Sequence, residues 1–231
     1  MALLNDEVRD ATRRKFADEM VNPVRLIHFT QEPSRLIVLN PLAGQECFFC
    51  KETKQLLEEV ADCSDKIQLE VYDFKADKAK ADELGIDKIP ATLIKGEKDA
   101  AVRIFGIPSG YEYTSLLEAV IDVSKGETSL DPKTKEALEA VDRDVHIQVF
   151  VTPTCPYCSL AVRLAHQFAL ESPHIKADMI ESTEFPHLAN KFGVYGVPKT
   201  VVNETISFEG AVPEEVFLEN VLKALAPPPQ S

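Results

Sequence analysis

Apolar and polar positions follow each other along the chain in two successive series, and both series predict the same order of elements. The first series opens with residues 3–21, where apolar side chains recur about every four positions, as in an amphipathic helix. The pattern that follows predicts strands at 24–29, 36–39, 67–72, 92–94 and 102–105, and helices at 47–61, 77–84 and 113–123.

The second series repeats this order after a polar stretch at 124–132 that breaks the periodicity. It predicts helices at 133–142, 155–171, 188–192 and 213–225, and strands at 146–151, 175–180, 200–202 and 205–208. We therefore expect an N-terminal domain at 1–123, a short junction at 124–132 and a C-terminal domain at 133–231. Because the junction is short, the two domains are expected to pack against each other.

Two Cys-x-x-Cys pairs occupy equivalent places in the two series. Cys155 follows Cys47 by 108 positions, and Pro198 follows Pro90 by the same interval. Each half of the chain thus brings a pair of thiols and, about 40 residues later, a proline that can face them.

The order strand, Cys-x-x-Cys, helix, strand, helix, turn with proline, two strands and helix is that of thioredoxin. We predict an α/β fold of two tandem thioredoxin-like domains, each a central mixed sheet flanked by helices. The segments 152–158 and 160–166 closely resemble the glutaredoxin-like protein disulfide oxidoreductases of hyperthermophiles, as do 20–24 and 208–211. The first half departs from that pattern in its Phe48-Phe49 dipeptide and in the added stretch 42–46.

Thiol–disulfide exchange needs an accessible thiolate with a second thiol within reach. Two residues between cysteines at a helix start meet this need, because the free N–H groups and the positive dipole end stabilise a thiolate. We expect Cys47 and Cys155 to attack, and Cys50 and Cys158 to resolve the mixed disulfide.

The repeated prolines are candidates for cis peptide bonds, because they recur at one offset from both dithiols. In that arrangement Ile89-Pro90 and Val197-Pro198 would hold an extended substrate beside the attacking sulfur by strand addition. Tyr157, between two cysteines at a helix start, should be exposed near the substrate.

The residues around the cysteines bear on redox potential. Pro156-Tyr157 resembles the dipeptide of glutaredoxins, so the second site is expected to be the better disulfide donor. Thioredoxin-like proteins often bury a carboxylate behind the resolving cysteine, but the predicted strands 36–39 and 147–151 are uncharged.

Composition excludes some classes of function. The formal net charge of −13 argues against nucleic acid as a partner, since phosphate binding needs clustered Lys and Arg. No segment reaches the apolar length of a membrane span, and acids near the N-terminus do not fit a secretion signal, so we expect a cytoplasmic protein. The two cysteine pairs lie too far apart for a compact zinc module, and neither a metal nor a cofactor is expected. Cys63 has no nearby partner in sequence and is expected to be buried or inert.

These observations predict a dithiol–disulfide oxidoreductase that reduces and forms disulfides in protein substrates, with rearrangement of disulfides as a further activity. The resemblance implies intracellular disulfide formation in a heat-loving organism and recharging by a thioredoxin-reductase-like flavoprotein. A dedicated electron relay to a peroxiredoxin-type partner and a non-catalytic peptide-holding chaperone module remain alternatives. A glutathione-dependent activity ranks lower, because only Lys199 and Gly210 suggest a glutathione subsite.

Overall fold

A computed structural model describes residues 2–31, 47–98 and 100–225 of the chain. Its strands form one eight-stranded mixed sheet in the order β2-β1-β3-β4-β6-β5-β7-β8. The strands are β1 (Val24–Thr30), β2 (Ile67–Asp73), β3 (Ala91–Lys95), β4 (Ala101–Phe105), β5 (Val145–Val151), β6 (Ile175–Glu181), β7 (Lys199–Val202) and β8 (Ile206–Glu209).

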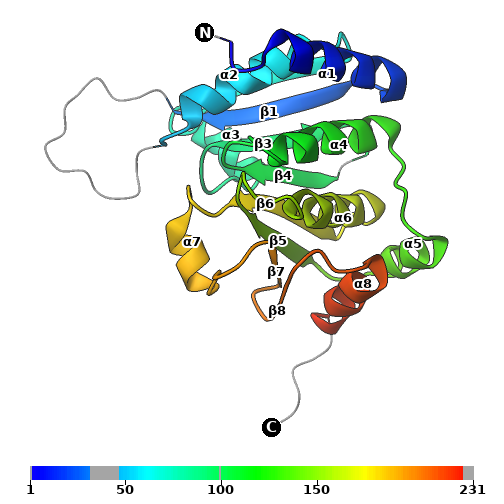
Figure 1. Cartoon of the computed structure of the whole chain (residues 1–231). Helices are drawn as coiled ribbons and strands as arrows, with labels where there is room; N and C mark the ends of the chain where they lie inside the picture. The colour runs from blue at the N-terminus through cyan, green and yellow to red at the C-terminus, as the bar shows by residue number, and fades with distance from the viewer. Residues whose placement is uncertain (1, 32–46, 99, 226–231) are drawn as a thin grey trace, which may run out of the picture.

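Helices cover both faces of this sheet (Figure 1). They are α1 (Asp6–Glu19), α2 (Cys50–Ala61), α3 (Lys78–Glu83), α4 (Glu112–Lys125), α5 (Pro132–Glu139), α6 (Cys158–Glu171), α7 (Pro186–Lys191) and α8 (Glu214–Lys223). None of these described helices is long and apolar enough to cross a lipid bilayer.

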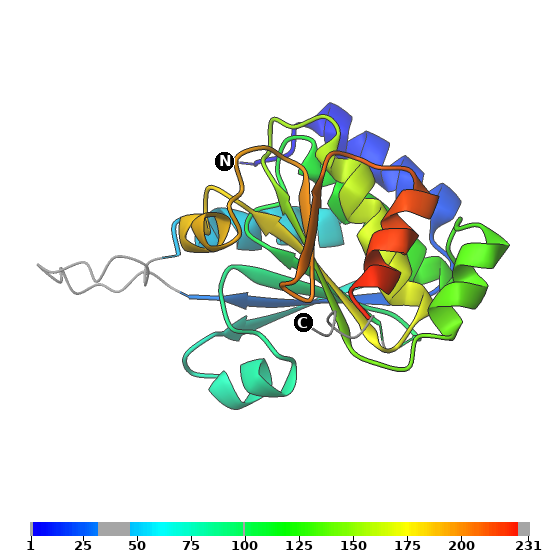
Figure 2. The same cartoon turned by 90° about the horizontal axis from the view of Figure 1, so that it is seen from below.

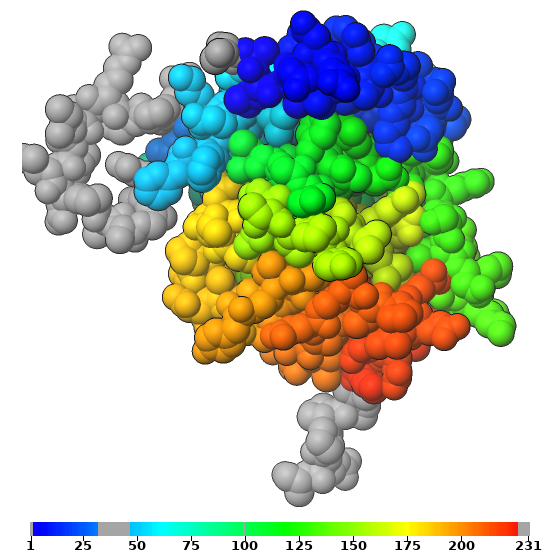
Figure 3. Space-filling view, in the orientation of Figure 1, coloured from blue at the N-terminus to red at the C-terminus, as the bar shows by residue number. Residues whose placement is uncertain are grey.

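The two halves of the chain have the same local topology and meet along one pair of strands. β1 pairs in parallel with β2 and antiparallel with β3, just as β5 pairs in parallel with β6 and antiparallel with β7. β4 of the first half runs parallel to β6 of the second, from Ala101 opposite Lys176 to Phe105 opposite Ile180. The tandem thioredoxin-like fold is therefore confirmed, and the two halves share one sheet and a broad contact surface (Figure 3).

Alternation along the strands divides the core between the two faces of the sheet. Val24 and Leu26 of β1 belong to the larger apolar cluster, which α1, α2, α4 and α6 cover, whereas Ile27 and Phe29 belong to a smaller cluster beneath α3 and α7. Figure 2 shows α3 on the opposite side of the sheet from α1, α4, α6 and α8. Residues of both dithiol helices belong to the larger cluster, which packs these helices against the strands.

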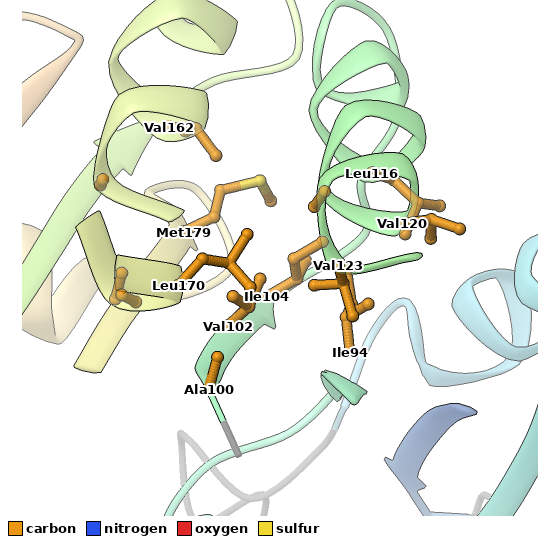
Figure 4. Packing of buried hydrophobic residues seen from close by; sticks show 14 of the residues in the cluster. Ile94, Ala100, Val102, Ile104, Leu116, Val120, Val123, Val162, Leu170 and Met179 are labelled. Carbon is orange, nitrogen blue, oxygen red and sulfur yellow. The ribbon is translucent and has the colours of Figure 1, made fainter. Parts of the chain in front are cut away.

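The larger cluster continues across the boundary between the two halves. In Figure 4, Ile104 of β4 lies between Val120 of α4 on one side and Met179 of β6 and Val162 of α6 on the other. All four side chains are fully buried. Burial of an aliphatic side chain of this size contributes about 1.5–3 kcal/mol, so this packing opposes separation of the halves.

A buried ion pair also joins the two halves, on the other face of β4 and β6. Arg103 Nε and Nη2 donate to the Asp178 carboxylate at 2.6 and 2.8 Å, and His146 Nε2 lies 2.6 Å from the same carboxylate. Burial alone would raise the pKa of Asp178, but the hydrogen bond from His146 and the charge of Arg103 hold that pKa well below its usual range. Breaking such a buried pair leaves an uncompensated charge.

The element boundaries differ from the sequence prediction at two places that bear on the site. Both dithiol helices begin at the second cysteine, Cys50 or Cys158, and not at the first. The predicted strand 36–39 and the approach stretch 42–46 lie outside the described residues. β1 is the described strand that precedes the first dithiol, since it pairs with its neighbours as β5 does.

Candidate active site

Each dithiol forms a disulfide directly before a helix. The Cα atoms of Cys47 and Cys50 are 5.4 Å apart, and those of Cys155 and Cys158 are 5.5 Å apart. The second cysteine is the first residue of α2 or α6, so the first cysteine lies in the turn that the unpaired N–H groups of the helix face. This geometry suits stabilisation of a thiolate on Cys47 and on Cys155 once each disulfide is reduced.

The four sulfurs are not equally covered. Cys50 and Cys158 are buried, as suits a resolving cysteine, and Cys47 is partly exposed. Cys155 is only 8% exposed, less than the sequence led us to expect. The cause is the loop before β7, because the Cys155 sulfur lies 3.6 Å from the carbonyl oxygen of Val197.

The two proline loops have matching geometry. The Ile89-Pro90 and Val197-Pro198 peptide bonds are both cis. The Gly106 N–H donates to the Pro90 carbonyl oxygen at 2.9 Å, and the Gly210 N–H donates to the Pro198 carbonyl oxygen at 2.8 Å. In the second half, the contact between Val197 and Cys155 brings the predicted substrate loop to the sulfur that is expected to attack.

The residues between the cysteines present aromatic rings to solvent. Tyr157 is 66% exposed and Phe48 is 80% exposed. Phe49, the residue before α2, is 41% exposed. Both sites are therefore bordered by exposed apolar rings.

A buried histidine behind the first dithiol was not anticipated from sequence. His28 lies on β1 two residues before Thr30, whose hydroxyl donates to the Cys50 carbonyl oxygen at 3.4 Å. Its Nδ1 lies 3.0 Å from the Ala91 carbonyl oxygen, which can only accept, so Nδ1 carries the proton and Nε2 is the bare nitrogen. Burial lowers the pKa of His28 to about 4, so the imidazole is neutral at pH 7. The matching position on β5 is Val149, since Val24 and Val145 begin their strands opposite Ile67 and Ile175.

A buried carboxyl close to the second dithiol was also not anticipated. Glu112 is the first residue of α4 and fully buried, and the preceding Tyr111 N–H donates to the Pro153 carbonyl oxygen at 3.0 Å, two residues before Cys155. Ser115 Oγ donates to one carboxyl oxygen at 2.6 Å, and the other has no hydrogen-bond partner among the described residues. Burial raises the pKa of Glu112 to about 7. An acidic residue at the start of a helix is normally exposed to solvent, so the burial of Glu112 could not be predicted from the sequence.

The remaining candidate groups offer little chemistry. Within residues 2–31, 47–98 and 100–225, no three His, Cys, Asp or Glu side chains gather closely enough to hold a metal ion. Cys63 is a buried free thiol, and burial raises its pKa, which disfavours the reactive thiolate. The polar groups that bear on the chemistry are therefore those around the two disulfides.

Comparison with known proteins agrees with this geometry. The family model of the thioredoxin domain matches residues 145–223. The crystal structure of a protein disulfide oxidoreductase from Aeropyrum pernix aligns with a TM-score of 0.85 at 33% identity, covering 96% of this chain and 93% of that one. The thioredoxin of Methanocaldococcus jannaschii is 34% identical over 82 residues, which are 35% of this chain and 96% of that protein.

A longer protein shares both halves of the chain. An alkyl hydroperoxide reductase component of Pseudomonas aeruginosa is 23% identical over 171 residues, 74% of this chain but 31% of that protein. The chain spans less than a third of the length of the longer curated relatives that it matches. Two Cys-x-x-Cys disulfides, the thioredoxin order of elements and the full-length match to the Aeropyrum protein agree on one assignment. The chain belongs to the protein disulfide oxidoreductases, enzymes of thiol–disulfide exchange built on two tandem thioredoxin-like domains.

Proposed function

We propose that the chain reduces, forms and rearranges disulfides in protein substrates, and that both dithiols take part. The observation that carries this proposal is the second site: a disulfide at a helix start whose first sulfur lies 3.6 Å from the Val197 carbonyl, beside a proline loop that can hold a peptide. The first site repeats the disulfide, the helix start and the loop.

The proposed reaction proceeds by exchange of sulfur–sulfur bonds. When the enzyme acts as a reductant, the Cys155 thiolate bonds to one substrate sulfur, and the other substrate sulfur leaves with the electron pair of the broken disulfide. Cys158 then attacks Cys155, forms the enzyme disulfide and releases the second substrate thiolate. The reverse sequence oxidises a substrate dithiol, and Cys47 and Cys50 carry the same steps at the first site.

Substrate binding is proposed for the residues that flank each sulfur. The backbones of Ile89-Pro90 and Val197-Pro198 would pair with an extended peptide, since Ile89 and Val197 are partly exposed and a loop edge next to a strand can add one more strand. Tyr157 would contact apolar side chains next to the substrate cysteine, because its ring is exposed between the two sulfurs. We assign these roles to two domains at 1–123 and 133–231, joined by a junction at 124–132. Helix α4 runs two residues past the proposed end of the first domain, to Lys125, and α5 starts at Pro132.

The proposed redox partners follow from the relatives. A thioredoxin-reductase-like flavoprotein would recharge the dithiols in a cytoplasmic setting. A dedicated relay to a peroxiredoxin-type partner is the second candidate, because the alkyl hydroperoxide reductase component of Pseudomonas aeruginosa resembles this chain over 171 residues. Turnover on generic protein disulfides, set against turnover on a single cognate protein, separates the two.

The test is insulin reduction with dithiothreitol as the electron donor. The Cys47→Ser/Cys155→Ser double variant should fall to the background rate of dithiothreitol alone, whereas Cys63→Ser, which removes the buried thiol, should keep full turnover. Full turnover by the double variant would show that these sulfurs are not the nucleophiles. Suppression of insulin aggregation that survives replacement of all four site cysteines would favour the peptide-holding chaperone.

A further inference from the structure

Both dithiols lie at the same edge of the sheet. β1 is antiparallel to β3, β3 is antiparallel to β4, and β4, β6 and β5 run parallel to one another, so β1 and β5 point in the same direction. Each dithiol helix begins at the edge where its strand ends. In Figure 1 the start of α2 and the helix α7, which follows β6, accordingly lie on the same side of the molecule.

The distance between the two sites is set by the strand order. Three strands, β3, β4 and β6, separate β1 from β5, which makes four strand intervals. At about 4.8 Å for each interval, the two strand ends are roughly 19 Å apart. An extended polypeptide advances about 3.3 Å per residue, so about six residues span this distance.

Exposed aromatic side chains gather at this edge. Among the described residues, the exposed Phe and Tyr side chains all belong to segments next to a dithiol: Phe48, Phe49, Tyr111, Tyr157 and Tyr195. Tyr195 is 97% exposed and lies two residues before Val197, whose carbonyl contacts the Cys155 sulfur. An apolar surface of this kind on an otherwise acidic protein marks a contact site for another polypeptide.

The loop that carries Tyr111 connects the two sites. It starts at Gly106, whose N–H donates to the carbonyl oxygen of Pro90 at the first site, and ends at Tyr111, whose N–H donates to Pro153 at the second. Between these ends, the Ile107 N–H donates to Glu184 Oε1 at 2.6 Å. Tyr111 is 51% exposed on this loop, so its ring is available to a polypeptide that passes from one site to the other.

We propose that one extended polypeptide occupies both dithiol sites at once, with its apolar side chains on the aromatic rings along this edge. The inference rests on the proposed function and names its substrate class: an unfolded or partly folded chain with two cysteines separated by at least about six residues. Once one cysteine is bound, the second reaches the other site at an effective concentration of about 1 mM, which favours reaction of both on the same enzyme molecule.

The test uses the Cys50→Ser/Cys158→Ser variant, which keeps both attacking thiols and cannot resolve a mixed disulfide. The probe is a linear peptide with two cysteines, each capped as a disulfide with thionitrobenzoate. A protein thiolate bonds to the peptide sulfur, the peptide–thionitrobenzoate bond breaks, and the coloured thionitrobenzoate anion leaves with the electron pair. Peptides with a spacer of two residues, about 7 Å, or ten residues, about 33 Å, between the cysteines are compared.

With the long spacer, we expect two thionitrobenzoate anions per protein and a one-to-one adduct by mass spectrometry. The second release should be independent of peptide concentration and, at about 10 µM peptide, about 100-fold faster than reaction with a single-cysteine peptide. The short spacer should give two peptides per protein. Two peptides per protein with the long spacer as well would overturn the inference. Failure of single-cysteine peptides to react at Cys47 and Cys155 would instead contradict the proposed function.

The aromatic contribution is tested on the same variant. A spacer rich in Leu and Val should bridge about fivefold faster than one of Ser and Gly, and Tyr111→Ser should abolish most of that preference. Leu222→Ser is the matched control, because Leu222 is 39% exposed on α8, on the other side of the molecule from α7 (Figure 1). Equal rates for the two spacers, or an equal loss in the control, would show that the exposed rings do not bind the substrate.

Discussion

The two dithiol sites share one backbone frame but differ in what surrounds the sulfurs. At the first, Cys47 is partly exposed next to Phe48, and a neutral histidine, His28, is buried behind Cys50. At the second, Cys155 is covered by the Val197 loop, and the buried carboxyl of Glu112 lies near its approach segment. The two sites therefore have the same backbone geometry, and we expect the different side chains around them to give them different redox potentials.

The largest expected difference concerns the equilibrium that each site reaches with substrate. If the first site has the potential of thioredoxin and the second that of a glutaredoxin, the gap of about 40 mV or more corresponds to at least a 20-fold difference in equilibrium constant. Cys47→Ser, which leaves the second site, should therefore oxidise a reduced model peptide further than Cys155→Ser does. Each oxidised variant is mixed with an equal amount of reduced peptide without glutathione, and the peptide disulfide is quantified once exchange between the two has reached equilibrium. Equal extents of oxidation would mean that the two sites are redundant.

The second site should depend more strongly than the first on the contact between the two halves. Gly110 has φ of +61°, and a Cβ atom there would collide with the Pro153 carbonyl oxygen, two residues before Cys155. Gly110→Ala should cost about 2–5 kcal/mol of unfolding free energy and slow exchange at Cys155 more than at Cys47.

Gly126→Ala provides the matched control for that variant. Gly126 has φ of +66°, but nothing lies within 4 Å of the position of its Cβ. Gly126→Ala should therefore lower the free energy of unfolding only by the strain of a left-handed backbone at a non-glycine residue, about 1–2 kcal/mol. Urea unfolding of both variants measures the difference, and equal costs would show that the Pro153 contact is unimportant.

The buried carboxyl near the second site should make the fold less stable as pH rises. The pKa of Glu112 is raised to about 7 from an ordinary value of 4.5, so its contribution to the free energy of unfolding is complete below pH 4.5 and is lost as pH rises to 7. In the wild-type protein this loss amounts to up to about 3 kcal/mol, and it should be absent from Glu112→Gln. The free energy of unfolding at pH 5 and at pH 8 measures it, and an unchanged pH dependence would contradict the burial of a titrating carboxyl.

The buried histidine near the first site should have the opposite effect. The pKa of His28 is lowered to about 4 from 6.5, so the unfolded chain takes up a proton that the folded chain refuses, and stability falls as pH drops from 6.5 to 4. His28→Val, which copies Val149 of the second half, should remove up to about 3 kcal/mol of that loss. His166 is also buried, with its pKa lowered to about 4, and it remains in the variant. The variant should therefore keep the part of the acid sensitivity that comes from His166. A variant as acid-sensitive as the unmodified protein would contradict the assignment.

Periodic features were readily predicted from the sequence, whereas contacts between the halves were not. The dithiols, the prolines and nearly all the described elements follow from spacing, because each rests on a local pattern. The pairing of β4 with β6 could not be predicted in this way. Apolar residues such as Val102 and Ala177 indicate that each strand has a buried face, but they do not identify the partner strand. In the sequence, Arg103 and Asp178 each look like an ordinary solvent-exposed charged residue. They form a buried ion pair only because β4 and β6 pair with each other.

The two buried titratable groups show why parts of the site escape prediction from the sequence. The apolar run 36–39 precedes the first dithiol more closely than 24–29 does, so the pattern favours it as the adjacent strand and gives His28 no role. β1 in fact holds that place, with the same pairings as β5. Glu112 resembles an ordinary acid in the first turn of a helix, and its burial depends on the loop from Gly106 to Tyr111 packing against the second half.

The central claim, that both dithiols exchange and that they do so at different potentials, is tested most directly by a redox titration of the chain with both sites intact. After equilibration in glutathione buffers and alkylation, mass spectrometry reports the oxidised fraction of each cysteine pair separately. We predict two separate transitions, with Cys155–Cys158 at the less negative potential. A pair that never changes state across the range, or two coincident transitions, would contradict the account.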